Sequence, residues 1–428
     1  MRRTVETGKT LLVDGPASVT LLSGAAEILG ARFRRGSRLV IRGGKRVPFF
    51  VTSNAEFDVL LGDKGAADLF EGSTVPASWE SCVKTVLAKN DKPVIAMIVG
   101  AIDVGKTSFC AYLTNMALKE KQRVAIVDAD LGQSDVGPPS TVGSCHVTRP
   151  IYDPFEIGAE DVCFIGVTSP SGATKETLDG IARITEKTLK SGIDVLIINT
   201  DGWVEGEDAV RYKLALAKRI KPSILIGLQE KNELTFLLGA LAEIDSNAIE
   251  SSPAVRKRDR DERKVLRELG YKKYLKGAAV QSFPFNWVRI SGVPFGSGMP
   301  PSNNRMMKIV EQIGTSPLYC EETSESIFIA LSKQQWADEE IAKALEGSFG
   351  KKVKIIWEGD EEGLLVALHD KDGSFLGIGI IEALDYERKV LKVYTNARKN
   401  VASIQVGQVK LDKSGKELGL STVFNDYL

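Results

Sequence analysis

The sequence contains few cysteines, no long apolar run and no excess of either charge. Its cysteines are odd in number and lack CxxC spacing; they are Cys82, Cys110, Cys145, Cys163 and Cys320. This pattern argues against a disulfide framework and a cysteine-based zinc site, and it fits a reducing compartment. Fifty-six lysines and arginines balance 56 aspartates and glutamates, so any site for a polyanion must be a local patch.

The chain also lacks segments that would direct it into a membrane. Its N-terminal stretch MRRTVETGKTLLVDG has no apolar core like that of a signal peptide. No apolar run approaches the ~18 residues that a membrane-spanning helix needs. We therefore expect a soluble cytoplasmic protein with no membrane partner. At 428 residues, the chain is long enough for two or three domains.

Three regions of the chain differ in pattern. Residues 1–88 contain short strands broken by glycine, such as SVTLLSG and RLVIRGG, which is typical of a small antiparallel sandwich or barrel. Residues 89–298 alternate apolar strands with helices, which is typical of a parallel, doubly wound sheet. Residues 299–428 return to strand patterns such as KVKIIWEG and FLGIGII. We predict an α/β protein whose central parallel-sheet domain is flanked by β-rich N-terminal and C-terminal domains.

The stretch PVIAMIVGAIDVGKTSFCAYLTN runs from an apolar strand through a glycine-bounded loop into a helix. From Gly100 to Thr107 it fits the phosphate-loop pattern GxxxxGK(S/T), in which backbone N–H groups surround the phosphates of a nucleotide. Lys106 is expected to reach the transferred phosphoryl group and Thr107 to bind Mg²⁺. The alternative is a glycine-containing loop that precedes a helix by chance and binds no nucleotide. The predicted nucleotide site comprises Gly100, Ala101, Ile102, Asp103, Val104, Gly105, Lys106, Thr107 and Ser108.

The next strand ends in AIVDADLGQSDVGPPST, which puts Asp128, Asp130 and Gln133 at its carboxyl end. Ligands bind at this edge of an open α/β sheet, so these side chains should lie beside the phosphate loop. A carboxylate there can hold Mg²⁺ or accept a proton from an attacking hydroxyl. Alternatively, the acidic residues simply end a strand and begin a turn.

Two further segments each have a functional interpretation and a purely structural one. Trp203 follows a third strand in DVLIINTDGWVEG, where it either stacks on a base or anchors the core. The basic segment VRKRDRDERKVLRELGYKKYLKG spaces four arginines by 4, 3 and 4 residues, so they should share a helical face. That face is either solvated and ion-paired, or it is a lid that supplies an arginine to a phosphate site. The four are Arg256, Arg260, Arg263 and Arg267.

The motifs together resemble the polynucleotide 5′-hydroxyl kinase family, and most of all its archaeal branch. They are GAIDVGKT, DADLGQ, the Pro-Pro segment from Gly137 to Thr141, NTDGW and the arginine-rich segment. The family includes kinases of pre-mRNA cleavage, tRNA splicing and ribosomal RNA processing. The resemblance implies a central P-loop kinase domain (residues 89–298) with an arginine-rich lid (residues 253–277) between β-rich flanking domains. It implies ATP and Mg²⁺ as cofactors and 5′-hydroxyl RNA ends as substrates, with DNA ends as a further candidate.

The resemblance also implies a role for each matching residue. Asp130 would activate the 5′-hydroxyl and Arg263 would contact the transferring phosphate. The implied catalytic residues are Lys106, Asp130, Arg263 and Arg267, and the implied metal ligands are Thr107 and Asp128. The implied nucleic-acid contacts are Gln133, Pro138, Pro139, Ser140, Thr141 and Trp203. Arg256 and Arg260 remain further candidates for the lid contacts.

Two other functions are weighed against an active kinase. The first is an ATP-binding assembly subunit of an RNA-processing complex that does not turn nucleotide over, since a fold does not fix an activity. Loss of the lysine, the strand-end aspartate or the lid arginines would favour it, and the sequence retains all of them. The second is a regulatory GTPase or ATPase. A GTPase would need a guanine-selecting NKxD-type element, which LIINTDGW does not supply.

Overall fold

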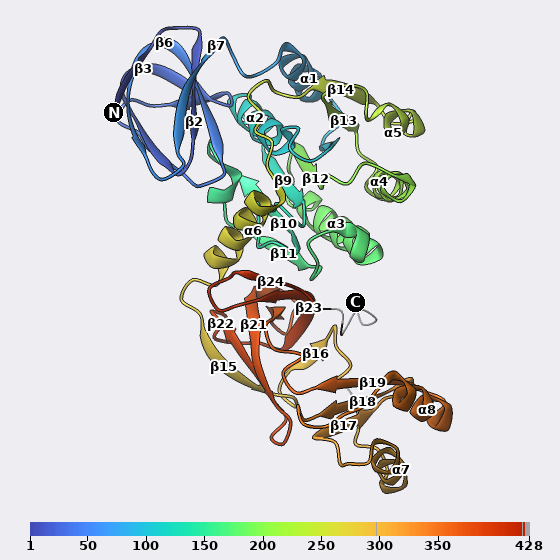
Figure 1. Cartoon of the computed structure of the whole chain (residues 1–428). Coiled ribbons are helices and arrows are strands. Elements are labelled where there is room, and N and C mark those ends of the chain that lie inside the picture. Colours follow the sequence, from blue (N-terminus) through green and yellow to red (C-terminus); the bar gives the residue numbers. More distant parts are fainter. Residues whose placement is uncertain (297, 422, 424–428) are drawn as a thin grey trace. The chain divides into compact units, whose positions relative to one another are not determined.

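The computed structural model describes residues 1–296, 298–421 and 423, and it shows two compact units. The first is Met1–Gly270, and the second begins at Tyr271. Figure 1 colours both from blue at the N-terminus to red near the C-terminus. Among the described helices, none has both the length and the apolar character to cross a bilayer.

An antiparallel sheet of seven strands opens the first unit. Residues of the long strands β3 and β6 alternate between buried and more exposed positions, because successive side chains point to opposite faces of a sheet. The predicted antiparallel β region is therefore present. Its strands are β1 (Arg2–Val5), β2 (Lys9–Asp14), β3 (Ala17–Ile28), β4 (Ala31–Phe33), β5 (Arg38–Ile41), β6 (Arg46–Leu61) and β7 (Ala66–Glu71).

The rest of the first unit is built on a second sheet, in the order β11-β10-β9-β12-β8-β13-β14. The pairs β9-β12, β12-β8, β8-β13 and β13-β14 are parallel, as predicted. Strand β10 is antiparallel to both of its neighbours, β9 and β11. The chain returns from β9 to β10 through a loop without a helix, which is too short for a parallel crossover. The strands are β8 (Val94–Gly100), β9 (Val124–Ala129), β10 (Thr141–Val147), β11 (Asp161–Phe164), β12 (Val195–Thr200), β13 (Ile224–Gln229) and β14 (Ser246–Glu250).

Helices accompany this second sheet. They are α1 (Ala77–Ala88), α2 (Lys106–Lys119), α3 (Thr174–Leu189), α4 (Glu207–Ile220), α5 (Thr235–Ala240) and α6 (Arg260–Tyr274), with the 3₁₀ turns η1 (Pro154–Glu156) and η2 (Pro170–Gly172). Helix α1 falls within the predicted N-terminal domain, yet Trp79, Cys82 and Val86 share the core of the second sheet. The indole of Trp79 also donates to the carbonyl of Glu250 in β14. The N-terminal sheet thus ends at β7.

The second unit contains two sheets. The larger has the order β15-β22-β21-β20-β23-β16, with β24 paired to β23, and the smaller has the order β17-β18-β19. The larger comprises β15 (Ala279–Pro284), β16 (Arg289–Ser291), β20 (Leu364–His369), β21 (Phe375–Asp385), β22 (Val390–Thr395), β23 (Ser403–Leu411) and β24 (Glu417–Leu420). The smaller comprises β17 (Tyr319–Glu322), β18 (Ser326–Leu331) and β19 (Lys352–Trp357), and it is accompanied by α7 (Asn303–Ile313) and α8 (Glu339–Phe349).

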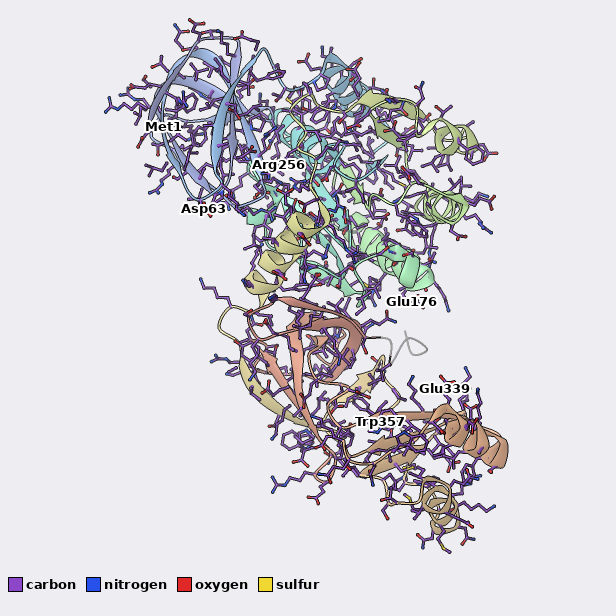
Figure 2. All side chains as sticks on the ribbon, in the orientation of Figure 1. Met1, Asp63, Glu176, Arg256, Glu339 and Trp357 are labelled. Carbon is purple, nitrogen blue, oxygen red and sulfur yellow. The ribbon has the colours of Figure 1, made fainter. Side chains whose placement is uncertain are left out.

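The second unit begins earlier than the sequence suggested. Residues 271–298 were predicted in the central domain, but β15 pairs with β22 and β16 pairs with β23. Hydrogen bonding to distant strands therefore assigns this segment to the second unit. The β-rich pattern after residue 299 is present, but α7 and α8 were not predicted. Figure 2 labels Glu339 at the start of α8 and Trp357 at the end of β19.

Candidate active site

The first unit contains a cavity of about 660 Å³ lined by loops that follow the parallel strands. Most of the predicted site residues line it: Ala101, Ile102, Asp103, Gly105, Lys106, Thr107, Ser108, Asp130, Gln133, Pro139, Trp203, Arg256, Arg263 and Arg267. The others predicted from the sequence do not line it: Gly100, Val104, Asp128, Pro138, Ser140, Thr141 and Arg260. The N-terminal sheet contributes Arg42, Lys45 and Arg46, which sequence analysis did not predict.

The phosphate loop connects buried strand β8 to helix α2. A Cβ at Gly100 would lie 2.5 Å from the backbone oxygen of Leu228, so only glycine fits between the two strands. Gly105 has φ of 99° and precedes the first residue of α2, where a side chain would strain the backbone. These two positions explain the glycines of the motif. The helix directs its free N–H groups toward the cavity end of the loop.

Lys106 is buried and folds back onto its own loop. Its Nζ donates to the carbonyl oxygens of Gly100 at 2.9 Å and Ala101 at 2.7 Å. Burial lowers the pKa of Lys106, against the opposing effect of Asp130. The two carbonyls satisfy an ammonium group that would otherwise be buried without partners.

Asp130 lies at the cavity wall after β9. Its Oδ1 accepts hydrogen bonds from the backbone N–H groups of Gly132 at 3.1 Å and Gln133 at 2.9 Å. In the part of the chain that the structure describes, nothing donates to Oδ2. Burial raises the pKa of Asp130, although Lys106 opposes the shift. One oxygen therefore fixes the carboxyl group while the other is placed to accept a proton.

Asp128 is buried and does not itself line the cavity. Its Oδ2 accepts from the N–H groups of Asp135 at 2.7 Å and Val136 at 3.0 Å, and from the Ser134 hydroxyl at 3.3 Å. Burial raises the pKa of Asp128 to about 7. These contacts hold the loop between β9 and β10. A role as metal ligand stays a prediction.

Asn199, at the end of β12, was missed by sequence analysis. It lies opposite Asp128 in the strand register, and its Nδ2 is 3.1 Å from the Asp128 carboxylate and 3.5 Å from the Thr107 hydroxyl. Its Oδ1 is buried without a hydrogen-bond partner among the described residues. The position of NTDG at the end of a strand next to β9 was the signal that could have found it.

The oxygens around Thr107 fit Mg²⁺, which prefers oxygen ligands and keeps several water and phosphate ligands. The Nδ2 of Asn199 contacts both the Thr107 hydroxyl and the Asp128 carboxylate, and the Oδ1 of the same amide is buried without a partner among the described residues. Within residues 1–296, 298–421 and 423, no group of three or more His, Cys, Asp or Glu is placed to hold a metal. An ion here would therefore depend on oxygens of the nucleotide.

Trp203 is half-buried and lines the cavity. Its ring stacks on Tyr212 at a centroid distance of 5.6 Å, and its backbone N–H donates to the Asp201 carboxylate at 2.9 Å. Asp201 in turn accepts from the Tyr212 hydroxyl at 3.0 Å and pairs with the buried ammonium of Lys213 at 2.8 Å. Tyr212 and Lys213 were missed, because nothing in the helical pattern of α4 distinguishes them. The cluster braces the indole at the cavity wall.

The Pro-Pro segment forms a rigid turn into β10. The Thr141 hydroxyl donates to the Pro138 carbonyl at 2.7 Å, and Ser140 has φ of 70°. Ser140 and Thr141 are fully buried, so they shape this turn, whereas Pro139 reaches the cavity. Helix α6 passes close to Pro139 at Gly270, where a Cβ would lie 2.8 Å from the proline ring. The turn and the lid helix are therefore in contact.

Helix α6 begins later than the arginine spacing predicted. Asp259 accepts from the N–H of Glu262 at 2.7 Å, and Glu262 accepts from the N–H of Asp259 at 3.2 Å. This reciprocal pair is a capping box, which starts the helix at Arg260. Arg256 therefore precedes the helix, and Arg260 is exposed and does not line the cavity. The prediction that all four arginines share one helical face is therefore wrong, but Arg263 and Arg267 do line the cavity.

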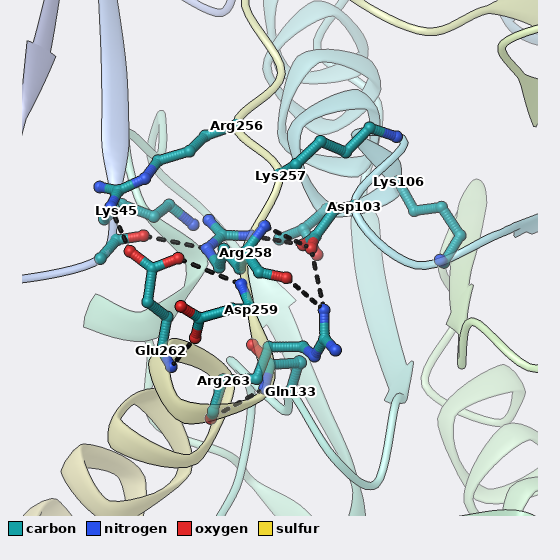
Figure 3. Close-up of polar contacts among 12 residues, drawn as sticks. Lys45, Asp103, Lys106, Gln133, Arg256, Lys257, Arg258, Asp259, Glu262 and Arg263 are labelled. Carbon is teal, nitrogen blue, oxygen red and sulfur yellow. Dashed lines mark hydrogen bonds and ion pairs between the residues drawn. The ribbon is translucent and has the colours of Figure 1, made fainter.

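Figure 3 shows how the lid is held against the phosphate loop. Asp103 accepts from the backbone N–H of Arg258 at 3.0 Å and pairs with its guanidinium at 2.8 Å. The guanidinium of Arg263 lies 3.4 Å from the same carboxylate and donates to the Arg258 carbonyl at 2.6 Å. The amide of Gln133 donates to the Arg263 carbonyl at 3.2 Å. Arg258 was missed because it lies outside the helical spacing.

A buried ion cluster joins the N-terminal sheet to this site. Arg42 pairs with Asp135 and, at 3.1 Å, with Asp153, which also pairs with Lys45 at 3.0 Å. Burial alone would raise the pKa of Asp153, but Lys45 and Arg42 outweigh it and hold that pKa well below its usual value. Because Asp135 lies in the loop between β9 and β10, these ion pairs connect the N-terminal sheet directly to the loop that carries Asp130.

Comparison with known proteins gives consistent results. Residues 100–277 match the family described as mRNA cleavage and polyadenylation factor CLP1 P-loop. The polyribonucleotide 5′-hydroxyl-kinase of Pyrococcus abyssi is 28% identical over 343 residues, covering 77% of this chain and 91% of that protein. Its counterpart from Methanocaldococcus jannaschii is 26% identical over 346 residues, covering 79% of this chain and 92% of that protein.

Solved structures show the same fold. Clp1p in its complex with Pcf11p matches with a TM-score of 0.68 at 13% identity, over 96% of this chain and 97% of that one. A second Clp1p–Pcf11p structure, concerned with ATP loss in a point mutant, also has a TM-score of 0.68, at 12% identity. The chain thus has the Clp1 fold, its residues 100–277 match the CLP1 P-loop family, and its homologues include proteins named polyribonucleotide 5′-hydroxyl-kinases.

Proposed function

We propose that this protein is a cytoplasmic, ATP-dependent polynucleotide 5′-hydroxyl kinase that transfers the γ-phosphate of ATP to the 5′-hydroxyl end of RNA. The observation that carries the proposal is the meeting of four groups at one cavity. They are the phosphate loop with Lys106, the carboxylate of Asp130, the indole of Trp203 and the lid guanidinium of Arg263. The names of the homologues support the same activity.

The reaction needs alignment and charge stabilisation, because the transition state of phosphoryl transfer is loose and anionic. Lys106 would exchange the carbonyls of Gly100 and Ala101 for phosphate oxygens. Arg263 would leave Asp103 for the transferring group, which offers it a stronger charge-assisted contact. Thr107, with Asn199 and Asp128 near it, would hold Mg²⁺, which neutralises phosphate charge when bound.

The acceptor side would use Asp130, Gln133, Pro139 and Trp203. Oδ2 of Asp130 would accept the proton of the 5′-hydroxyl as that oxygen attacks, and Trp203 would stack on the terminal base. Stacking accepts every base, so little base specificity is expected. DNA ends would be accepted unless the protein reads the 2′-hydroxyl, which distinguishes RNA from DNA.

The test is end-labelling of 5′-hydroxyl RNA and DNA oligonucleotides with γ-labelled ATP and Mg²⁺. We expect the label on the 5′ end of RNA, and none with Lys106→Ala. Label from Lys106→Ala equal to that from the unaltered protein would contradict the proposal. Binding of ATP without any transfer would favour the second candidate, an ATP-binding assembly subunit. The Clp1p–Pcf11p complex, which shares the fold, motivates that alternative.

A further inference from the structure

A second cavity, of about 680 Å³, lies in the first unit and has a strongly basic wall. Arg32 comes from β4, Arg34 and Arg35 follow that strand, and Arg149 follows β10. All four arginines are exposed. Tyr152 anchors this wall, since its hydroxyl donates to the Arg32 carbonyl at 2.9 Å and its ring packs edge-on against Phe33. The backbone of β4 at Arg32 and Phe33 is therefore tied to the segment that follows Arg149.

The charge of this wall is not cancelled locally. Within the described part of the chain, Arg32, Arg34 and Arg149 form no ion pair with a carboxylate, and Arg35 donates to a backbone carbonyl. Asp153 and Glu156 also line the cavity, but Arg42 and Lys45 already pair with Asp153, so the four arginines outnumber the carboxylates left to face them. The whole chain has no net charge, so four arginines around one hollow are a local anion site and not a general excess of charge.

The second cavity adjoins the active site through that ion pair. Asp153 lines the second cavity, while its partners Arg42 and Lys45 line the first. The contact between Arg42 and Asp153, at 3.1 Å, is therefore the wall that the two hollows share. A chain whose end lies in the first cavity can continue over this wall into the second.

We propose that Arg32, Arg34, Arg35 and Arg149 bind the phosphodiester backbone of the substrate RNA downstream of its 5′ end. The inference rests on the proposed kinase function. Guanidinium groups hold phosphates through two parallel hydrogen bonds, which lysines cannot do. Backbone contacts of this kind position a nucleic acid without reading its sequence. An acidic protein segment would meet the same charge, but the shared wall favours the polymer that already enters the active site.

The test compares a long single-stranded 5′-hydroxyl RNA with a 5′-hydroxyl dinucleotide, which is too short to leave the first cavity. The variant is Arg32→Gln/Arg34→Gln/Arg149→Gln. At 0.1 M salt its KM for the long RNA should rise roughly ten- to hundred-fold, and the slope of log KM against log salt should fall by about 2, because each phosphate contact on a single strand contributes about 0.7. Its KM for the dinucleotide and its kcat for both acceptors should not change.

The matched control is Arg211→Gln/Lys218→Gln/Arg219→Gln, which removes the same charge from the exposed face of α4. It should leave both acceptors unaffected. Unchanged KM for the long RNA, or an equal rise for both acceptors, would overturn the inference. Fluorescence anisotropy with the long RNA separates this test from the activity: weaker binding by the variant alone supports the basic wall even if no transfer occurs. Equal competition by polyglutamate of the same charge would instead assign the wall to an acidic protein.

Discussion

At the scale of single residues, the proposed chemistry depends most on Asp130. Asp130→Asn keeps the shape of the side chain and one acceptor for the N–H groups of Gly132 and Gln133, but it removes the base. We expect kcat to fall about 10²- to 10⁴-fold, the usual contribution of a general base, with little change in ATP affinity. Steady-state kinetics and ATP titration measure both. Glu205→Gln, a carboxylate change in the same cavity, should be neutral, and collapse of ATP affinity with unchanged kcat would give Asp130 a structural role.

The pH profile offers a separate check on Asp130. Burial raises its pKa in the folded protein, and a base must be deprotonated to act. Activity should therefore be lost as pH falls through this raised pKa, at a higher pH than the pKa of an ordinary aspartate. The measurement is kcat against pH with saturating ATP and 5′-hydroxyl dinucleotide. A flat profile down to the pKa of an exposed aspartate would contradict the role.

Trp203 separates substrate binding from stability. Because it is half-buried at the cavity and braced by Tyr212, Trp203→Ala should weaken oligonucleotide binding by about 1–3 kcal/mol, the usual contribution of base stacking. ATP affinity should stay the same. Fluorescence anisotropy with labelled RNA and a thermal melt provide the two readouts. A large drop in melting temperature with unchanged RNA affinity would return Trp203 to the role of a core anchor.

Residues within contiguous motifs were the predictable part of the site. The phosphate loop, Asp130 and Trp203 each directly follow an apolar strand, so periodicity places them at the ligand edge of the sheet. Asn199 and Arg42 could not be found in this way. Asn199 meets Thr107 only through the strand register, and Arg42 reaches Asp135 from a different sheet. Such long-range pairings leave no local pattern in the sequence.

At the scale of elements, α6 is the part whose prediction most needed correction. The spacing of its arginines predicted one helical face, but the capping box of Asp259 and Glu262 starts the helix at Arg260. That box was visible in the sequence as Asp-x-x-Glu, and it outweighs side-chain spacing because it satisfies free backbone N–H groups. Strand β10 was not predicted at all, and its antiparallel direction follows from the short return from β9, which rules out a parallel crossover.

The corrected helix supplies a matched pair of arginines. Arg263 lines the cavity and lies 3.4 Å from Asp103 on the phosphate loop, while Arg260 is exposed and does not line the cavity. If Arg263 contacts the transferring group as proposed, that contact is stronger in the transition state, and Arg263→Ala should lower kcat and kcat/KM together. Arg263→Lys should not restore the rate fully, because lysine lacks the planar fork. Arg260→Ala should match the unaltered enzyme, and equal kinetics for both Ala variants would make the lid a charged surface.

At the scale of the whole molecule, the chain has two units, each with its own buried core. The first unit contains the cavity that the phosphate loop lines. Units of this kind need not unfold in one transition. A non-hydrolysable ATP analogue at one hundred times its Kd should therefore increase the free energy of unfolding of the first unit by about 2.7 kcal/mol, and so raise the temperature at which that unit unfolds. Differential scanning calorimetry measures the shift, and Lys106→Ala should reduce it. Equal stabilisation of every transition would show that the units unfold together.

The order of the three regions was predictable because β and α/β patterns differ in period. Their boundaries were not, since α1 and the strands β15 and β16 belong where their partners lie. Cooperation between remote segments decides domain membership, and a local pattern does not contain it.

The contact between Gly270 and Pro139 also restricts which substitutions these two positions can accept during evolution. Any side chain at position 270 would meet the proline ring at 2.8 Å, and a ring cannot swing aside as a flexible side chain does. A lineage that gains alanine at 270 must therefore have lost the proline first, or must move the lid helix. Loss of the proline, in turn, opens a gap that a larger residue at 270 would fill. The two positions are thus coupled in their history although they are distant in the sequence, and we expect them to change in pairs across relatives.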